Sequence, residues 1–286
     1  MKIVVTGYAS LDYAVRLDGA PTRDRTTTIV ARPRQWPRLG GSPAYVAAAL
    51  AAAGADEVWP ITWVGDDADG ALYRAGLKRL GLRDDGVGVR PGRTPICILA
   101  YEPGGGCHCL YDPGLPEPLD FDAAQRQLIA AADCLCITVG PPEAARAALA
   151  LARPDVRLVW AVKADPRAVP PDLAATLAAR AEVVVHSRGE APFVAAAFVR
   201  AATLRTDVTR VETRGPGGVA VTQAGPTKFY PVDPIETEDT TGAGDTFLGG
   251  FLAAYVGGGK TAAEAVRTGV ASVSALLAAR LESERG

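Results

Sequence analysis

The chain has 286 residues, of which 48% are hydrophobic and 22% charged, and its formal net charge is −2 at pH 7. This composition suits one large α/β domain with a sizeable core and excludes a disordered chain. No basic stripe and no evident apolar run of membrane-spanning length is found, so we expect neither nucleic acid nor a membrane as partner. The N-terminus, Met1-Lys-Ile-Val-Val-Thr-Gly7, does not resemble a signal peptide, which predicts a cytoplasmic protein.

Apolar strand-like runs alternate with alanine-rich helical patterns along the chain. The predicted strands are 3–6, 59–64, 96–101, 135–139, 158–162, 183–186 and 219–222. The predicted helices are 43–53, 68–80, 123–132, 143–152, 172–181, 190–202, 242–256 and 262–281. Strands that are apolar on both faces and separated by helices indicate a mostly parallel sheet covered on both sides. Ligands bind such sheets beyond the carboxyl ends of the strands.

Two segments interrupt this alternation. Residues 13–38 and 93–113 contain β-branched pieces, prolines and a Gly104-Gly-Gly106 turn, which favour inserted hairpins. The alternative is two long surface loops, although long loops without structure are uncommon. The prediction is an α/β core of residues 1–12, 39–92 and 114–286 with the two β segments inserted into it.

The cysteines occur as two C-x-C pairs, Cys107–Cys109 and Cys134–Cys136, with Cys97 apart from them. Structural zinc sites usually space their cysteines further apart, so we expect no zinc site. Free and mostly buried thiols in a reducing compartment are the prediction.

The first candidate site lies after the first predicted strand. Asp12 follows that strand, where it would either bind a ligand or cap local amides. In the run Gly40-Gly41-Ser42-Pro43, the serine suits a helix N-cap and the proline suits the first helical position. Two glycines before a capped helix also allow a ligand to lie against bare backbone.

Two further motifs follow later strands. The segment Ser187-Arg-Gly-Glu190 comes after strand 183–186, and its glutamate could belong simply to the first turn of the next helix. The segment Thr213-Arg-Gly215-Pro-Gly-Gly218 precedes strand 219–222 and, taken alone, predicts only a hairpin turn.

The most specific motif is Asp239-Thr-Thr-Gly-Ala-Gly-Asp245, a glycine turn that opens the helix predicted at 242–256. The first amides of a helix have no intrahelical partners and form an anion site, usually for phosphate. An acid beside such a site suits a group that orients and deprotonates an attacking hydroxyl. The alternative is an ordinary first-turn acid that stabilises the helix, and the helix terminus should lower the pKa of Asp245.

The run Asp239-Thr-Thr-Gly-Ala-Gly-Asp245-Thr-Phe-Leu-Gly-Gly250 resembles the signature of the ribokinase-like (PfkB-type) carbohydrate kinase family, and the resemblance covers nearly the whole chain. It implies a three-layer core with a mostly parallel central sheet and a small β lid that covers the substrate and often forms a homodimer. It further implies transfer of the γ-phosphate of ATP to a primary hydroxyl of a small sugar, with a nucleoside as the alternative acceptor.

The resemblance also assigns roles to residues of the catalytic and acceptor sites. The amides of Gly242, Ala243 and Gly244 would form the anion hole, and Asp245 would be the catalytic base. The acceptor would contact Asp12, Gly40, Gly41 and the residue at position 45. Position 45 holds Tyr where the family usually has Asn, and this tyrosine, Tyr13, Trp36 or Tyr101 could stack a nucleoside base.

On the nucleotide side, the resemblance implies contacts from Thr213, Gly215 and Gly218. Glu190 would bind Mg²⁺ through water, with Ser187 replacing the usual Asn of that motif. The family often uses a monovalent cation such as K⁺ beside the anion hole, and Asp239 and Thr241 are its candidate ligands here.

Overall fold

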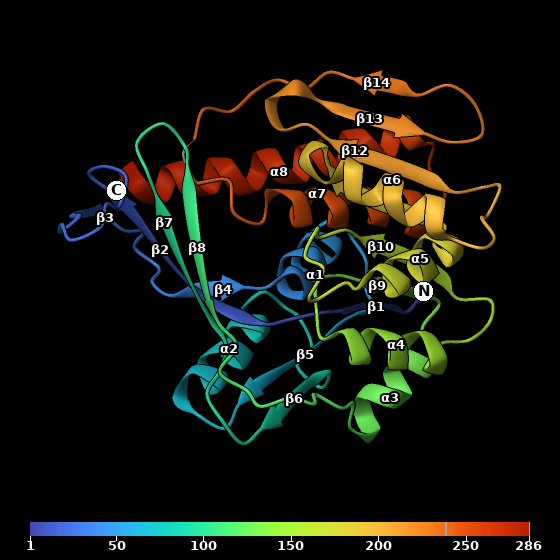
Figure 1. The fold of residues 1–286 in the computed structure, drawn as a ribbon, viewed down its shortest axis with the longest axis horizontal. Coiled ribbons are helices and arrows are strands. Elements are labelled where there is room, and N and C mark those ends of the chain that lie inside the picture. The colour runs from blue at the N-terminus through green and yellow to red at the C-terminus, as the bar shows by residue number, and fades with distance from the viewer. Residues whose placement is uncertain (238, 286) are drawn as a thin grey trace.

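The computed structural model describes residues 1–237 and 239–285, and a nine-stranded sheet forms its centre (Figure 1). The strands lie in the order β14–β13–β12–β11–β10–β9–β1–β5–β6, and those from β12 to β6 run parallel. Their bounds are β1 Ile3–Thr6, β5 Val58–Gly65, β6 Val87–Arg90, β9 Cys134–Ile137, β10 Arg157–Ala161, β11 Val183–Ser187, β12 Thr209–Thr213, β13 Val219–Thr222 and β14 Lys228–Tyr230.

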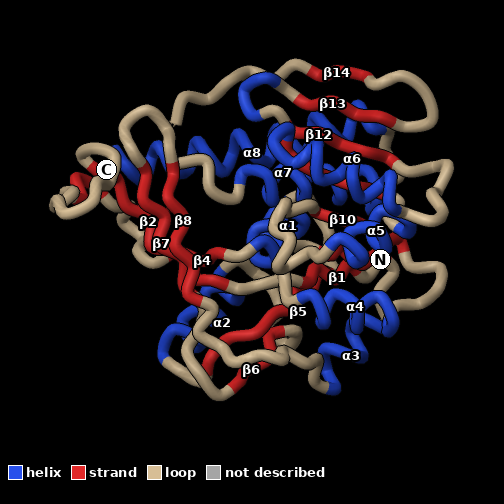
Figure 2. The backbone as a smooth tube through the Cα atoms, viewed as in Figure 1, coloured by secondary structure: helices blue, strands red, loops and turns tan. Residues whose placement is uncertain are grey.

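Helices cover both faces of this sheet and make the fold three-layered (Figure 2). One face carries α1 (Ser42–Ala52), α2 (Ala68–Arg79), α7 (Ala243–Leu252) and α8 (Ala262–Arg285). The other carries α3 (Ala123–Ala130), α4 (Pro142–Leu151), α5 (Pro171–Arg180) and α6 (Ala191–Arg200). Successive strand residues alternate between the two resulting cores: Ile3 and Val5 pack into the first, and Val4 into the second.

A second, smaller sheet projects from one end of the core (Figure 1). Its strands are β2 (Ser10–Leu17), β3 (Ile29–Ala31), β4 (Arg38–Gly40), β7 (Ile96–Tyr101) and β8 (Cys107–Asp112). The order is β3–β2–β7–β8, with β4 paired to β2, so the two inserted segments combine in one sheet. Asp12 lies within β2, and Gly40 is the last residue of β4. The small sheet therefore carries Asp12 and the first glycine of the pair.

These findings confirm the predicted fold class of an α/β core with a mostly parallel sheet. Two edge strands, β6 and β14, were not predicted, because runs of three or four residues at a sheet edge show little periodicity. The cysteines are free, and Cys97, Cys134 and Cys136 are buried, which agrees with the expectation of mostly buried thiols; Cys107 and Cys109 on β8 are exposed.

The sequence was expected to contain no apolar run of membrane-spanning length, and one helix does not meet this expectation. Ala262–Glu282 within α8 is long and apolar enough to cross a membrane by length and composition alone, with a mean hydropathy of 1.2. In this fold the helix packs along α7 on one face of the core, and 28% of its apolar window is buried.

Candidate active site

The glycine turn of the Asp239–Asp245 motif forms the start of α7. Gly242 has φ +71° and occupies the N-cap, a left-handed conformation that favours glycine. The Ala243 amide donates to the Thr240 carbonyl over 3.0 Å, so it is not available to an anion in this arrangement. The amides of Gly244 and Asp245 have no acceptor within the described residues, and a Cβ at Gly244 would meet nothing within 4 Å. The amides of this turn that are open to an anion in the structure are therefore those of Gly244 and Asp245, whereas the Ala243 amide is engaged within the turn.

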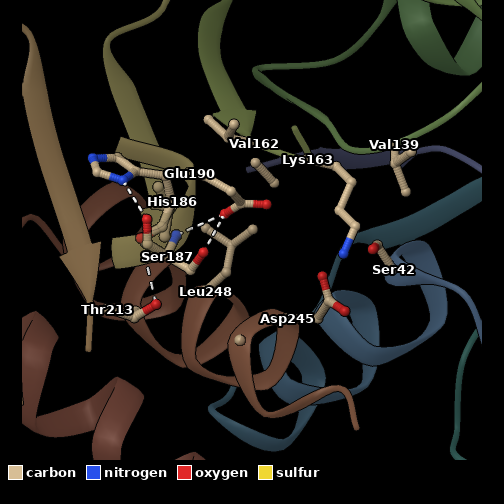
Figure 3. A pocket seen from close by; sticks show the side chains of 13 residues that line it. Ser42, Val139, Val162, Lys163, His186, Ser187, Glu190, Thr213, Asp245 and Leu248 are labelled. Carbon is tan, nitrogen blue, oxygen red and sulfur yellow. Dashed lines mark hydrogen bonds between the residues drawn. The ribbon is translucent and has the colours of Figure 1, made fainter. Parts of the chain in front are cut away.

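A cavity of about 300 Å³ opens directly in front of this turn (Figure 3). It extends along the carboxyl ends of β9 to β12, the edge at which parallel sheets bind ligands. Its described lining comprises Ser42, Val139, Ala161, Val162, Lys163, Val185, His186, Ser187, Glu190, Thr213, Gly244, Asp245 and Leu248. The cavity therefore brings together predicted residues from three separate motifs.

Asp245 points into the cavity from the first turn of α7 (Figure 3). Burial raises the pKa of its carboxyl group to about 6, against a hydrogen bond from Ser42 and the charge of Lys163, which both lower it. The charges of Asp12 and Glu190 act in the same direction as burial. The expectation of a lowered pKa was wrong because desolvation outweighs the helix terminus here.

Asp12, on β2, does not line the cavity, but it lies near enough to Asp245 for its charge to act on that carboxyl group, and its side chain is almost completely buried. Its Oδ1 accepts from the Ser10 hydroxyl over 2.7 Å, and its Oδ2 lies 3.4 Å from the Tyr45 hydroxyl. Burial raises the pKa of Asp12, while Ser10 and nearby Arg38 act to lower it. A carboxyl group with two partly used oxygens can still accept hydrogen bonds from the hydroxyls of a small ligand.

The glycine pair before α1 has a clear packing reason in addition to any ligand role. A Cβ at Gly40 would lie 1.9 Å from Oδ1 of Asp12, so any side chain there would displace that carboxylate. Gly41 has φ +81°, and a Cβ on it would lie 2.3 Å from the Tyr8 carbonyl. Both positions therefore keep Asp12 and the loop after β1 close to the start of α1.

Tyr45 on α1 takes up the space beside the turn. A Cβ at Gly242 would lie 2.6 Å from its ring, so the ring packs directly on that glycine. The Arg280 guanidinium lies 6.0 Å from the centre of the same ring and within 3.4 Å of its hydroxyl. Of the aromatic residues considered for base stacking, Tyr13 packs edge-to-face on Trp36, and Tyr101 donates to Asp239.

Asp239 is held by arginines rather than left open to a cation. Arg38 donates to both of its carboxylate oxygens, over 2.5 and 3.1 Å, and Arg280 lies 3.4 Å from Oδ1 and 3.3 Å from the backbone carbonyl. Burial raises the pKa of Asp239, but Arg38 outweighs this effect and holds the pKa at about 2. Thr241 contacts Tyr101 through its hydroxyl. Two guanidinium charges already contact the Asp239 carboxylate, and they oppose the approach of a further cation to Asp239 and Thr241.

Glu190 faces the cavity from the turn after β11 (Figure 3). Its Oε2 accepts from the backbone amide and the hydroxyl of Ser187, over 2.7 and 2.8 Å, which makes a capping box. Within the described residues, Oε1 receives no hydrogen bond, so a water of a hydrated cation can reach it. This arrangement fits Mg²⁺ held through water, since that ion keeps several of its waters.

Of the predicted nucleotide residues, only Thr213 lines the cavity. Gly215 and Gly218 lie in the turn that follows β12, with φ of +55° and +94°. A Cβ at Gly218 would lie 2.4 Å from the Tyr230 carbonyl, so packing against β14 is sufficient reason for that glycine. Thr213 therefore faces the cavity, whereas the two glycines shape the adjoining turn without lining it.

Four polar residues of the site were not predicted from the sequence: His186, Lys163, Arg38 and Arg280. Lys163 lies two residues beyond β10, where the strand-end rule could have indicated it. Arg38 and Arg280 had no local signal, because their partner Asp239 is 201 and 41 residues away in the sequence.

Comparisons with known proteins agree with this geometry. The family model described as pfkB family carbohydrate kinase matches residues 1–280. An ATP-dependent ribose-1-phosphate kinase of Halopiger xanaduensis is 28% identical over 259 residues, which covers 90% of this chain and 85% of that protein. A cytidine kinase of Thermococcus kodakarensis is 26% identical over 283 residues, covering 94% of each chain.

Among solved structures, a ribokinase of Cryptococcus neoformans var. grubii in complex with ADP superposes with a TM-score of 0.77. It is 20% identical, and the match covers 94% of this chain and 91% of that one. That likeness concerns the fold, whereas the family match extends over the strands, the cavity and the Asp239–Asp245 turn. The protein is a kinase that belongs to the pfkB family of carbohydrate kinases.

Proposed function

We propose that this protein transfers the γ-phosphate of ATP to a primary hydroxyl of a small sugar. The observation that carries the proposal is the convergence of Asp245, the Gly244 amide and Glu190 on one cavity, with Asp12 next to it. A base, an anion site and a metal-organising acid are the parts that phosphoryl transfer requires, because catalysis depends mainly on positioning and charge stabilisation.

In this proposal Asp245 accepts a hydrogen bond from the acceptor hydroxyl and takes its proton as the phosphoryl group arrives. A pKa of about 6 makes the carboxylate a stronger base than an ordinary aspartate while leaving it mostly ionised at neutral pH. The Gly244 and Asp245 amides, at the positive end of α7, stabilise the charge on the transferring group. Asp12 holds further hydroxyls of the acceptor.

Glu190 is the residue that we propose holds Mg²⁺, through water and its free Oε1. When bound, the ion would neutralise charge on the phosphates of ATP. Thr213 would contact the nucleotide from the far end of the cavity, and Gly215 and Gly218 would shape the turn beside it.

A nucleoside is the second candidate acceptor, since one relative is named a cytidine kinase. A specific observation supports it: Tyr8, in the loop after β1, packs on Tyr111 of β8 with ring centres 5.7 Å apart. This pair joins the core to the small sheet and offers an aromatic surface. The sugar remains the first choice, because Tyr13, Trp36, Tyr45 and Tyr101 are engaged in other contacts.

We further propose that the small sheet is a lid over the acceptor and that two copies pair through it in the cytoplasm. The face of the sheet away from Asp12 exposes Ile98 and Leu110, which are direct cross-strand neighbours. Exposed apolar residues gathered on one sheet face favour association with a second copy.

An ADP-release screen tests the proposal. Purified protein would be incubated with ATP–Mg²⁺ and a panel of pentoses, hexoses, pentose phosphates and nucleosides. We expect ADP release with at least one sugar, and a decrease in kcat of about 10²–10⁴-fold in Asp245→Asn with nucleotide affinity nearly unchanged. Release with nucleosides alone would favour the second candidate, and near-normal turnover in the variant would refute the role of Asp245.

A further inference from the structure

Lys163 is a cavity residue that the proposed function does not use. It lies just beyond β10, on the same edge of the sheet as the ends of β9, β11 and β12. Figure 3 shows its side chain extending across the cavity, with Nζ directed toward the Asp245 carboxylate and the Ser42 side chain. The lysine therefore approaches the anion site from the side opposite the start of α7.

The charge of the cavity makes this position unusual. Two carboxylates, Asp245 and Glu190, line it, and ATP would add several negative charges. Among the thirteen described lining residues, Lys163 is the only lysine or arginine. The two arginines near the site, Arg38 and Arg280, form ion pairs with Asp239 instead.

Lys163 does not serve a structural ion pair in the described part of the chain, where no carboxylate oxygen lies within 4.0 Å of its Nζ. An exposed lysine on a flexible stem normally remains in water, and here its ammonium group is directed toward Asp245 in the first turn of α7 (Figure 3), in a cavity that Gly244 also lines. A cation placed where charge develops in the transition state lowers the barrier to transfer.

We propose that Lys163 is a catalytic residue that contacts the transferring phosphoryl group opposite the Gly244 amide. The inference rests on the proposed function, because it assumes that this group passes between Asp245 and the turn. In the step, the acceptor oxygen bonds to the γ-phosphorus, the bond from that phosphorus to the β-bridging oxygen breaks, and the acceptor proton goes to Asp245. Lys163 keeps its proton throughout and acts as a positive charge.

A second effect follows from the same placement. The groups that act on the Asp245 carboxyl are Ser42 from α1, Lys163 from the end of β10, Asp12 from β2 and Glu190 from the turn before α6, and the Cys136 thiol of β9 also interacts electrostatically with it. Ser42 and Lys163 favour the ionised carboxylate, and the two acids oppose it. Loss of Lys163 would therefore raise the pKa of Asp245 and move the acidic limb of the rate profile to higher pH.

The test compares Lys163→Met and Lys163→Arg with a matched control, Lys260→Met. Lys260 is exposed in the turn before α8 and does not line the cavity. For each variant, kcat and the KM values for ATP and acceptor are measured from pH 5 to 9. The dissociation constant of ATP–Mg²⁺ is measured by calorimetry without acceptor, and thermal unfolding confirms the fold.

We expect K163M to lower kcat about 10²–10³-fold, the range for loss of one group that stabilises transition-state charge. The acceptor KM should change less than about threefold, and the acidic limb should move upward. K163R should retain most of the activity and K260M all of it, whereas ATP affinity should fall about tenfold in K163M, as for loss of a charged hydrogen bond.

A K163M enzyme with kcat within about threefold of the wild type and an unmoved acidic limb would overturn the inference. The calorimetric measurement of ATP–Mg²⁺ binding distinguishes this result from failure of the proposed function. If no acceptor is turned over, the proposed function fails, and a tenfold loss of ATP affinity in K163M still supports the lysine contact with phosphate. Unchanged ATP affinity in that case refutes the contact as well.

Discussion

At the residue scale, two carboxylates of one short motif have opposite environments. Asp245 is desolvated beside other acids, and its pKa is raised to about 6, whereas Arg38 holds the pKa of Asp239 at about 2. The first is suited to accept a proton and the second is permanently charged. Pairs of acids whose surroundings separate their pKa values commonly mark the division between a base and a structural anion.

The rate should depend on pH through Asp245, because only its ionised form can accept the hydroxyl proton. We expect kcat/KM to be constant above pH 7 and to fall about tenfold per pH unit below about 6, the folded-state pKa. A profile measured in buffers of constant ionic strength would check this. A rate that stays constant down to pH 5 would contradict the assignment.

The ionised Asp245 carboxylate should also lower the free energy of unfolding at neutral pH. The pKa of Asp245 in the fold, about 6, exceeds the ordinary value of 3.8, so folding takes up a proton between these values. Its burial therefore destabilises the fold above pH 6, and the penalty disappears as the pH falls toward 3.8. We expect Asp245→Asn to raise Tm at pH 8 by roughly a few degrees, and this gain to shrink toward pH 5. A lower Tm for the variant at pH 8 would be inconsistent with a desolvated carboxylate.

The arginines at Asp239 predict that turnover does not require K⁺. Two guanidinium groups supply positive charge at the carboxylate where a cation was expected, and like charges oppose binding of a further cation. We expect rates in KCl and in choline chloride, at equal ionic strength, to agree within about twofold. Saturable activation by K⁺ of more than about fivefold would show that the ion binds nevertheless.

At the scale of elements, the start of α7 contains two glycines that are needed for different physical reasons. Gly242 has φ +71° and its Cα faces the ring of Tyr45, so a side chain there is both strained and crowded. Gly244 is open on its side-chain position and faces the cavity. The turn is therefore shaped by packing at one glycine and by access to a ligand at the other.

Substitution of each glycine by alanine should separate these roles. Gly242→Ala should lower the free energy of unfolding by about 1–2 kcal/mol or more, the cost of a left-handed residue, and should also lower activity. Gly244→Ala should unfold at nearly the wild-type temperature yet reduce kcat, because its methyl group enters the cavity beside the anion site. Denaturant unfolding and steady-state kinetics on both variants would check this. Equal losses of stability would contradict the distinction.

At the scale of the whole molecule, the small sheet is joined to the core through the site itself. Arg38 of β4 and Tyr101 of β7 both bind Asp239, and Tyr111 of β8 packs on Tyr8 of the core. Motion of this sheet would therefore alter the surroundings of Asp239 and of the acceptor residues together. Its outer face exposes the apolar side chains of Ile98 and Leu110, and Leu110 is 60% exposed.

The exposed face predicts a homodimer. We expect light scattering after size exclusion at about 10–50 µM to give twice the chain mass, and Leu110→Lys to shift the protein toward monomer without loss of Tm, because a charge opposes burial of that face. Leu204→Lys, at an exposed leucine distant from the sheet, serves as the control. A monomeric wild-type protein at these concentrations would remove the proposed pairing.

Most of the order of strands and helices, the parallel sheet and the glycine turn at Asp245 could be predicted from the sequence. Apolar periodicity, helix caps and glycine conformations depend on residues a few positions apart, so one segment contains the whole signal. Short edge strands such as β6 lacked that signal, because their pairing is decided by neighbours distant in the chain.

Only the tertiary structure decided which charges meet. Arg38 and Asp239 are 201 residues apart in the sequence. Lys163 approaches Asp245 because β10 ends and α7 begins at the same edge of the sheet. Burial, which sets the pKa of Asp245 and reverses the expectation from the helix terminus, is likewise a property of packing. Electrostatic interactions depend on distance in space and on exclusion of water, and neither quantity is encoded within a single segment of the chain.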